Sequence, residues 1–172
     1  LLIYKGAKLE AKDSNENTPL HWASYFGHTA IVKLLLSKGA NVAAKDHNGM
    51  TALHWAAHEG HKDIIKLLIN KEAKLKAKDR DGSTALHWAT HKGHLEFVQV
   101  LLDSRADIEA EDKLGMTALH WASKYGHIEI INALVIAGAK LEAKNRDGST
   151  ALHWASYLGH AAIVKLLLSK GA

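Results

Sequence analysis

Histidine and tryptophan stand side by side five times in this sequence, each time within the hexapeptide T-x-L-H-W-A. Histidine is the commonest metal ligand in proteins, so such pairs could belong to a metal site. Tryptophan faces can also surround a cation, and both residue types can pack in a core. The hexapeptides begin at Thr18, Thr51, Thr84, Thr117 and Thr150.

The spacing of the hexapeptides helps to decide between these alternatives. Successive copies begin 33 residues apart, with no insertion in any interval. A fixed period of about 20–50 residues is typical of stacked repeats. A catalytic site usually gathers one copy each of several different residues, whereas here a single constellation recurs. We therefore predict a repeated structural unit, with neither enzymatic activity nor a cofactor.

The strongest local arrangement for a metal is formed by His87, His91 and His94. His87 and His91 would share one face of a helix at i, i+4 spacing. His94 is expected to begin the following helix, so the set is far weaker than the H-E-x-x-H zinc motif. The sequence has no cysteine, which excludes thiolate ligands and disulfides alike. We expect no metal site.

Composition narrows the class of protein. The chain has 172 residues, which suggests one domain, and its hydrophobic share of 47% is close to that of ordinary soluble proteins. No apolar run approaches the roughly 20 residues of a membrane span. The net charge is +4, but acidic residues outnumber basic ones in residues 79–111, which interrupts any basic stripe for a nucleic acid. We expect a protein that binds neither membrane nor nucleic acid, in the cytoplasm or the nucleus.

Residues 46–78 illustrate what one unit contains. The letters D-H-N-G predict a turn, and Thr51 has the chemistry of a helix N-cap. A short helix is predicted over Ala52–Glu59, ended by Gly60, the residue type that adopts a left-handed conformation after a helix. A second helix is predicted over about Lys62–Asn70. Neither helix is long enough to be stable alone, so each must pack against a neighbouring unit.

By this division the chain comprises the end of one unit, four full units and a truncated unit. Their residues are 1–12, then 13–45, 46–78, 79–111 and 112–144, then 145–172. The leucine, tryptophan and alanine of every hexapeptide recur in register. We predict that all three are buried in one core that runs the length of the stack.

The pattern resembles the ankyrin repeat, a unit of about 33 residues with T-P-L-H-x-A followed by G-H. The resemblance covers residues 13–172 in five units, and residues 1–12 match the end of an earlier unit. It implies an all-α repeat solenoid of stacked helix-turn-helix ankyrin repeats with β-hairpin loops. It also implies that the histidine of each hexapeptide ties the start of its helix to the hairpin loop.

Three positions depart from the repeat. Glu16 stands where the later units have a glycine in the hairpin turn. Glu72 and Arg105 stand where the other units have a glycine after the second helix. If these backbones keep a positive φ, each non-glycine residue costs roughly 1 kcal/mol.

The resemblance and the repeat shape together indicate a function in recognition, because stacked repeats present extended concave surfaces. We predict a protein-protein interaction scaffold, a monomer that binds a partner protein of unknown identity on its concave and hairpin-tip surface. One alternative is a reader of methyl-lysine or another modified peptide, with a tryptophan cage near Trp55, Glu59 and Trp88. Another is a structural spacer within a longer ankyrin array.

The predicted contact residues lie at the hairpin tips and just before the glycine of the helix turn. They are Tyr25, Phe26, His47, Met50, His58, Glu59, Arg80, His91, Lys92, Leu114, Met116, Lys124, Tyr125, Arg146, Tyr157 and Leu158. Aromatic residues, methionine and arginine are enriched at interfaces. Their frequency in this set favours partner binding over a spacer.

Overall fold

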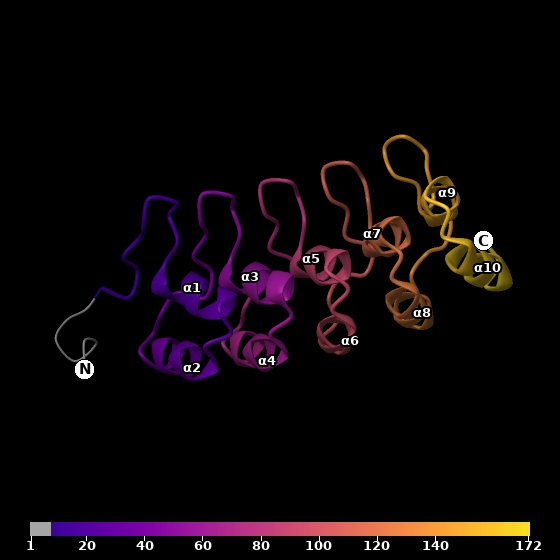
Figure 1. The fold of residues 1–172 in the computed structure, drawn as a ribbon. Coiled ribbons are helices and arrows are strands. Elements are labelled where there is room, and N and C mark those ends of the chain that lie inside the picture. The colour runs from indigo at the N-terminus through magenta and orange to yellow at the C-terminus, as the bar shows by residue number, and fades with distance from the viewer. Residues whose placement is uncertain (1–7) are drawn as a thin grey trace.

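The described part of the chain consists of short helices joined by loops. The computed structural model describes residues 8–172, in which ten α-helices form five consecutive pairs (Figure 1). The first helices of the pairs are α1 (Pro19–Tyr25), α3 (Ala52–Glu59), α5 (Ala85–His91), α7 (Ala118–Tyr125) and α9 (Ala151–Tyr157). The second helices are α2 (Thr29–Ser37), α4 (Lys62–Asn70), α6 (Leu95–Asp103), α8 (Ile128–Ile136) and α10 (Ala161–Ser169). Of the predicted unit end at residues 1–12, residues 1–7 lie outside this description.

Local signals set the ends of these helices. Thr51 precedes α3 with an extended backbone (φ −101°, ψ 170°), and Gly60 ends the helix in the left-handed region (φ 77°). Pro19 occupies the first position of α1, where its missing N–H leaves no helical hydrogen bond unmade. The bounds predicted for α3 and α4 are confirmed.

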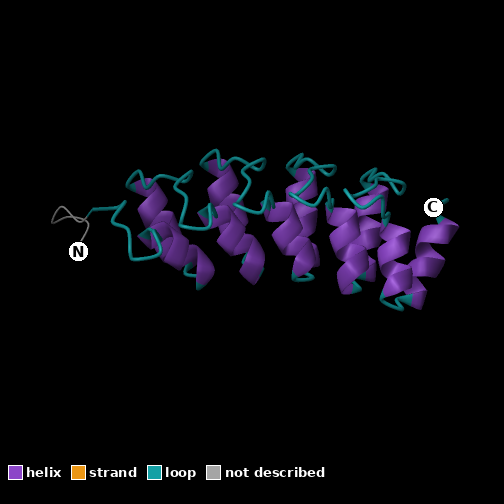
Figure 2. Ribbon diagram, turned by 90° about the horizontal axis from the view of Figure 1, so that it is seen from above, coloured by secondary structure: helices purple, strands orange, loops and turns teal. Residues whose placement is uncertain are grey.

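The helices form two parallel rows. Each first helix packs on its second helix and on the next first helix, and each second helix packs on the next second helix. The loops rise beside the row of first helices (Figure 1), and the view from above shows the pairs side by side along the stack (Figure 2). The core between the rows includes Leu20, Val32, Leu53, Ile65, Leu86, Val98, Leu119 and Ile131. The predicted all-α repeat solenoid is confirmed, and none of the helices described is long and apolar enough to cross a membrane.

Each loop makes a tight turn closed by two backbone hydrogen bonds. In the second unit the Asp46 N–H donates to the Met50 carbonyl (3.0 Å), and the Gly49 N–H donates to the Asp46 carbonyl (2.9 Å). One bond joins this loop to the next, from the Arg80 N–H to the Asn48 carbonyl (2.8 Å). Because no ladder of paired bonds forms, the described residues contain no strand, and the predicted β-hairpins are hairpin-shaped turns.

The prediction that the tryptophans are buried in the core is wrong. Trp22 is 43% exposed, and the other four tryptophans are only partly buried. Leucine and alanine of the hexapeptide are the residues that fill the space between units, with Leu53 1% and Ala56 0% exposed. The indole rings instead lie toward the loops, where the N–H groups of Trp22, Trp55, Trp88 and Trp121 donate to aspartate side chains.

The three residues that stand in place of a glycine keep the positive φ that glycine has there. Glu16, Glu72 and Arg105 have φ values of 62°, 62° and 61°. Glycines at the matching positions, such as Gly39 and Gly138, have φ values of 89° and 93°. The loop geometry therefore overrides the residue type, and each substitution adds backbone strain of roughly 1 kcal/mol.

Candidate functional site

The hexapeptide histidine joins each unit to the loop that follows. In the second unit the Thr51 N–H donates to Nδ1 of His54 (3.0 Å), and Nε2 of His54 lies 3.2 Å from the Ser83 carbonyl. A carbonyl can only accept, so Nε2 carries the proton and the ring is neutral. The same bond runs from His21 to Met50 (3.2 Å), from His87 to Met116 (3.0 Å) and from His120 to Ser149 (3.0 Å).

Burial enforces the neutral state of these four rings. His21, His54, His87 and His120 are each only 1–2% exposed. Loss of hydration on burial lowers the pKa of each imidazole below its ordinary value of 6.5. In the last unit His153 accepts from the Thr150 N–H (3.2 Å) but is exposed, and its Nε2 has no partner within the described residues. The role that the ankyrin resemblance implied for this histidine is thus present in the first four units.

In the second to fifth units a second histidine, from the G-H pair, joins the unit to the one before it. Nε2 of His61 donates to the Tyr25 carbonyl at the end of α1 (2.9 Å). The same bond recurs from His94 to His58, from His127 to His91 and from His160 to Lys124, at 3.0, 3.0 and 3.2 Å. The ring also covers the glycine of the preceding unit, because a Cβ on Gly27 would lie 2.6 Å from His61. The sequence identified the G-H pair but not this contact between units.

These bonds occupy two of the histidines considered for a metal. His87 is held by its threonine and the next loop, and His94 by the His58 carbonyl. Within residues 8–172 no group of three or more histidine, aspartate or glutamate side chains is placed to hold a metal ion.

An aspartate at the base of each loop positions the tryptophan. Asp46 Oδ1 accepts the backbone N–H groups of Asn48 (2.8 Å) and Met50 (2.9 Å), and Oδ2 accepts the indole N–H of Trp55 (3.0 Å). The indole bond recurs from Trp22 to Asp13, from Trp88 to Asp79 and from Trp121 to Asp112, at 2.9, 2.8 and 2.9 Å. Our sequence reasoning missed this pair, although an aspartate precedes the tryptophan by nine residues in four units.

The fifth unit breaks this pattern because Asn145 replaces the aspartate. Asn145 Oδ1 still accepts the N–H groups of Asp147 (3.0 Å) and Ser149 (2.8 Å). Its second polar atom is an amide nitrogen, which cannot accept from an indole. The indole nitrogen of Trp154 is accordingly buried without a hydrogen-bond partner.

The residue three positions after each tryptophan lies near the next ring. Tyr25 lies 6.0 Å from Trp22 and 5.2 Å from Trp55, measured between ring centroids. The equivalent distances are 6.1 and 5.3 Å for His58, and 5.7 and 5.2 Å for His91. Lys124 takes this place in the fourth unit, with Nζ 5.1 Å from the Trp154 ring. A band of rings therefore runs along the first helices on the side of the loops, and we call this surface the aromatic groove.

Most of the predicted contact residues are accessible along this groove. Phe26, His47, Arg80, Lys92, Leu114, Tyr125, Arg146, Tyr157 and Leu158 are exposed, and Tyr25, His58, Glu59, His91 and Lys124 are partly exposed. Met50 and Met116 are only 5% and 2% exposed. The expectation that these methionines are accessible is therefore wrong. The backbone N–H of each methionine donates to the loop aspartate and so closes the turn. This directs the methionine side chain inward between units.

The predicted cation cage between Trp55 and Trp88 is occupied by another side chain. The His58 imidazole contacts both rings. Its Nδ1 pairs with Glu59 Oε1, the carboxylate that the cage would need. This arrangement disfavours a methyl-lysine cage at that place.

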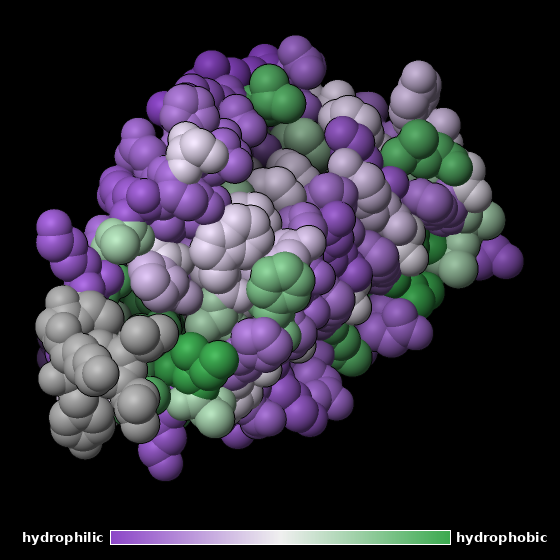
Figure 3. Space-filling model, turned by 60° about the vertical axis from the view of Figure 1, so that its left-hand side comes forward, coloured by the Kyte–Doolittle hydropathy of each residue, from purple (hydrophilic) through white to green (hydrophobic). Residues whose placement is uncertain are grey.

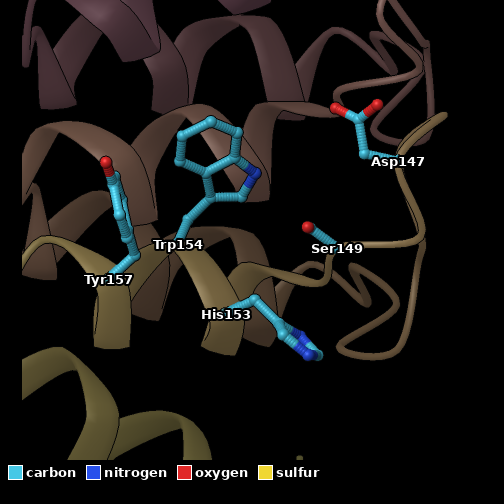
Figure 4. Close-up of a pocket in the computed structure, with 5 residues that line it drawn as sticks. All are labelled: Asp147, Ser149, His153, Trp154 and Tyr157. Carbon is cyan, nitrogen blue, oxygen red and sulfur yellow. The ribbon is translucent and has the colours of Figure 1, made fainter.

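A pocket lies at the fifth unit, beside the last of these tryptophans. Asp147 and Ser149 line it from the loop, and His153, Trp154 and Tyr157 line it from α9 (Figure 4). The Trp154 and Tyr157 rings stand next to each other there, while the His153 ring points away from them. Elsewhere, the face seen in Figure 3 shows hydrophobic side chains singly or in small groups among hydrophilic ones.

Comparison with known proteins identifies the class to which this architecture belongs. A family model for three ankyrin repeats matches residues 41–112, 72–145 and 107–172, and a model for a single ankyrin repeat matches residues 15–47. No curated protein matches the chain. The chain belongs to the ankyrin repeat family. Ankyrin repeats are generally protein-protein interaction modules and are typically non-catalytic.

We predict that Asn145→Asp stabilises the protein. The new carboxylate oxygen would accept the Trp154 indole N–H, and a hydrogen bond of this kind contributes about 1 kcal/mol. Thermal or urea unfolding would measure the gain. In a Trp154→Phe background the same substitution should give no gain, and Asp112→Asn should cost a similar amount by removing the bond to Trp121. An equal gain with and without the indole N–H would contradict this explanation.

We also predict that stability falls as the pH drops below about 6.5. The unfolded chain takes up protons on its histidines at that pH, whereas the buried rings resist protonation, so acid favours unfolding. His54→Gln should lower stability near neutral pH yet weaken its pH dependence. Glutamine can accept the Thr51 N–H at this capping position but takes up no proton. Urea unfolding between about pH 7.5 and pH 5 measures both effects.

The matched control is His153→Gln, because His153 is exposed and lacks the bond to a following loop. It should leave the pH dependence close to that of the wild type. A pH dependence that is unchanged in His54→Gln would show that the buried rings do not control acid stability.

Proposed function

We propose that this protein binds a partner protein through the aromatic groove. The observation that carries the proposal is the band of partly exposed rings, which is continuous from Trp22 to Trp121. Aromatic side chains supply large contact area and lose little conformational entropy on binding. The bonds from histidine and aspartate fix the loops behind the band, and such preorganisation lowers the cost of association.

The distribution of aromatic residues supports the groove over the second helices. Within residues 8–172, every tryptophan and tyrosine lies on a first helix. Phe97 lies on a second helix but is 1% exposed. The exposed hydrophobic residues of the second helices are isolated aliphatic ones, such as Ile136 and Leu168. Binding hot spots favour tryptophan, tyrosine and arginine, which agrees with this segregation.

The proposed contacts are the exposed and partly exposed members of the predicted set. The hairpin tips supply His47, Arg80, Leu114 and Arg146, and the helix ends supply the aromatic and charged side chains named above. Met50 and Met116 are left out because they are buried. A partner lying along the groove would touch both walls in several units.

We predict that truncating Phe26, Tyr125 and Leu158 to alanine abolishes partner binding. All three residues precede the glycine of a helix turn, and their side chains are 58%, 40% and 42% exposed. Changes at exposed positions usually alter stability by about 0.5 kcal/mol or less, so the variant should stay folded. Affinity capture with quantitative mass spectrometry, beside a thermal unfolding curve, measures both properties.

The control variant carries Ile31→Ala, Ile136→Ala and Leu168→Ala on the second helices. These side chains are 48%, 75% and 55% exposed, so a similar amount of apolar surface is removed away from the groove. It should retain the partner. Loss of the partner in the control, with retention in the groove variant, would move the interface to the second helices.

A further inference from the structure

The middle of the aromatic groove carries positive charge on both of its walls. Arg80 and Lys113 stand at the tips of the third and fourth loops and are exposed. Lys92 and Lys124 stand at the ends of α5 and α7, on the opposite wall. None of these four cations forms an ion pair with a carboxylate within residues 8–172.

The tryptophans span the space between these walls. The indole N–H of Trp88 bonds to Asp79, the residue before Arg80. The ring centroids of Trp88 and His91 lie 5.7 Å apart, and His91 is the residue before Lys92. Arg80 and Lys92 are therefore each next in sequence to a residue that contacts the Trp88 indole, and the Arg80 guanidinium lies 3.2 Å from His47 Nε2.

A related arrangement holds one unit further on, with the lysine and the ring exchanged: Lys124 stands at the place of His91, and Tyr125 at the place of Lys92. The indole of Trp121 bonds to Asp112 beside Lys113 (2.9 Å), and its ring lies 5.8 Å from the ring of Tyr125 beside Lys124. The third and fourth units thus present two similar combinations of a ring between two cations.

The electrostatic environment of His91 agrees with this distribution. Partial burial is the main cause that lowers the pKa of His91 to about 4, and the neighbouring Lys92, His58, His127 and Lys124 lower it further. A group on the groove floor is thus disfavoured when it carries positive charge. Burial disfavours charge of either sign there, and only the smaller contribution of the neighbouring cations favours an anion.

The acidic residues near this region do not neutralise it. Glu59 pairs with His58 in the second unit. Asp81, at the tip of the third loop, is exposed and forms no ion pair. Asp79 and Asp112, which accept the Trp88 and Trp121 indole N–H groups, stand beside Arg80 and Lys113. Three carboxylates thus stand among the four cations, and the cations remain in excess by one.

We infer that the middle of the aromatic groove binds an acidic, extended segment of the partner. Its carboxylates would lie against Arg80, Lys113 and Lys92, and its apolar side chains would lie on the Trp88 and Trp121 rings. This inference rests on the proposed function, because it specifies the chemistry of the segment that occupies the same groove.

The repeat of the groove indicates how the acidic residues should be spaced. Packed helices lie about 8–10 Å apart, and equivalent cations in neighbouring units should be separated by a similar distance. A polyproline II segment presents the same face every three residues, after a rise of about 9 Å. Carboxylates three residues apart would therefore meet equivalent positions in consecutive units.

The test is a selection of random peptides displayed on phage against the intact protein. Peptides of about 12 residues would extend roughly 37 Å, enough to cross three units. We expect the selected peptides to be enriched in aspartate and glutamate at three-residue spacing, with apolar residues between them. The best peptide, measured by fluorescence anisotropy, should bind at least about tenfold more weakly at high salt, because salt screens exposed charges.

Two charge-reversal variants locate the effect. Arg80→Glu combined with Lys113→Glu should remove the acidic enrichment and weaken the best peptide at least about tenfold, since each reversed charge repels the carboxylates. Lys33→Glu combined with Lys66→Glu changes two exposed lysines on α2 and α4 and should leave both results unchanged. Selected peptides without acidic enrichment, no selected peptide at all, or equal weakening by both variants would overturn the inference.

These outcomes are separate from failure of the proposed function. Non-acidic peptides that require Phe26, Tyr125 and Leu158 would refute the acidic segment and leave the binding groove in place. Peptides and partner that bind the groove variant as well as the wild type would refute both.

Discussion

The stack depends on a hydrogen bond from a neutral imidazole to the backbone of the following unit. No helix in the described residues is longer than nine residues, and helices of this length are unstable alone in water. The hexapeptide histidine holds its own helix start through Nδ1 and the next loop through Nε2. Both bonds can exist at once only when the ring is neutral and carries its proton on Nε2. Protonation of Nδ1 would remove the acceptor that caps the helix.

This constraint also shapes the surface. With its loop held by His21 and its helix end held by His94, the second unit is fixed at both walls of the groove. Asp46 then accepts the Trp55 indole and turns its ring toward the loop rather than into the core. The residues that hold the units together therefore present the aromatic band, which links the stability of the stack to the proposed binding surface.

Much of the fold could be predicted because its signals are local. Thr51 and Gly60 set the ends of α3 from their own backbone preferences, and the constant period carries the same arrangement through five units. The strained backbone at Glu72 and Arg105 could likewise be predicted from glycine at the matching positions. Side-chain directions could not. Met50 is buried and Trp22 exposed because contacts with the loop decide their orientation, whereas their positions in the repeat suggested the reverse.

The side-chain contacts were harder to predict than the helices, even within one unit. Asp46 and Trp55 each have a sufficient local explanation, as a turn residue and as a core residue, so nothing in one unit indicates that they pair. The replacement at Asn145, which leaves Trp154 without a partner, shows the value of comparing units within one chain.

The most direct test of this account is nitrogen-15 NMR of the histidine rings in the folded protein. The method reports which ring nitrogen is protonated and at what pH the second proton binds. We expect His21, His54, His87 and His120 to be neutral with the proton on Nε2, and to remain so when the pH falls below 6.5. Rings that carry the proton on Nδ1, or that become imidazolium at or above pH 6.5 while the protein stays folded, would contradict it.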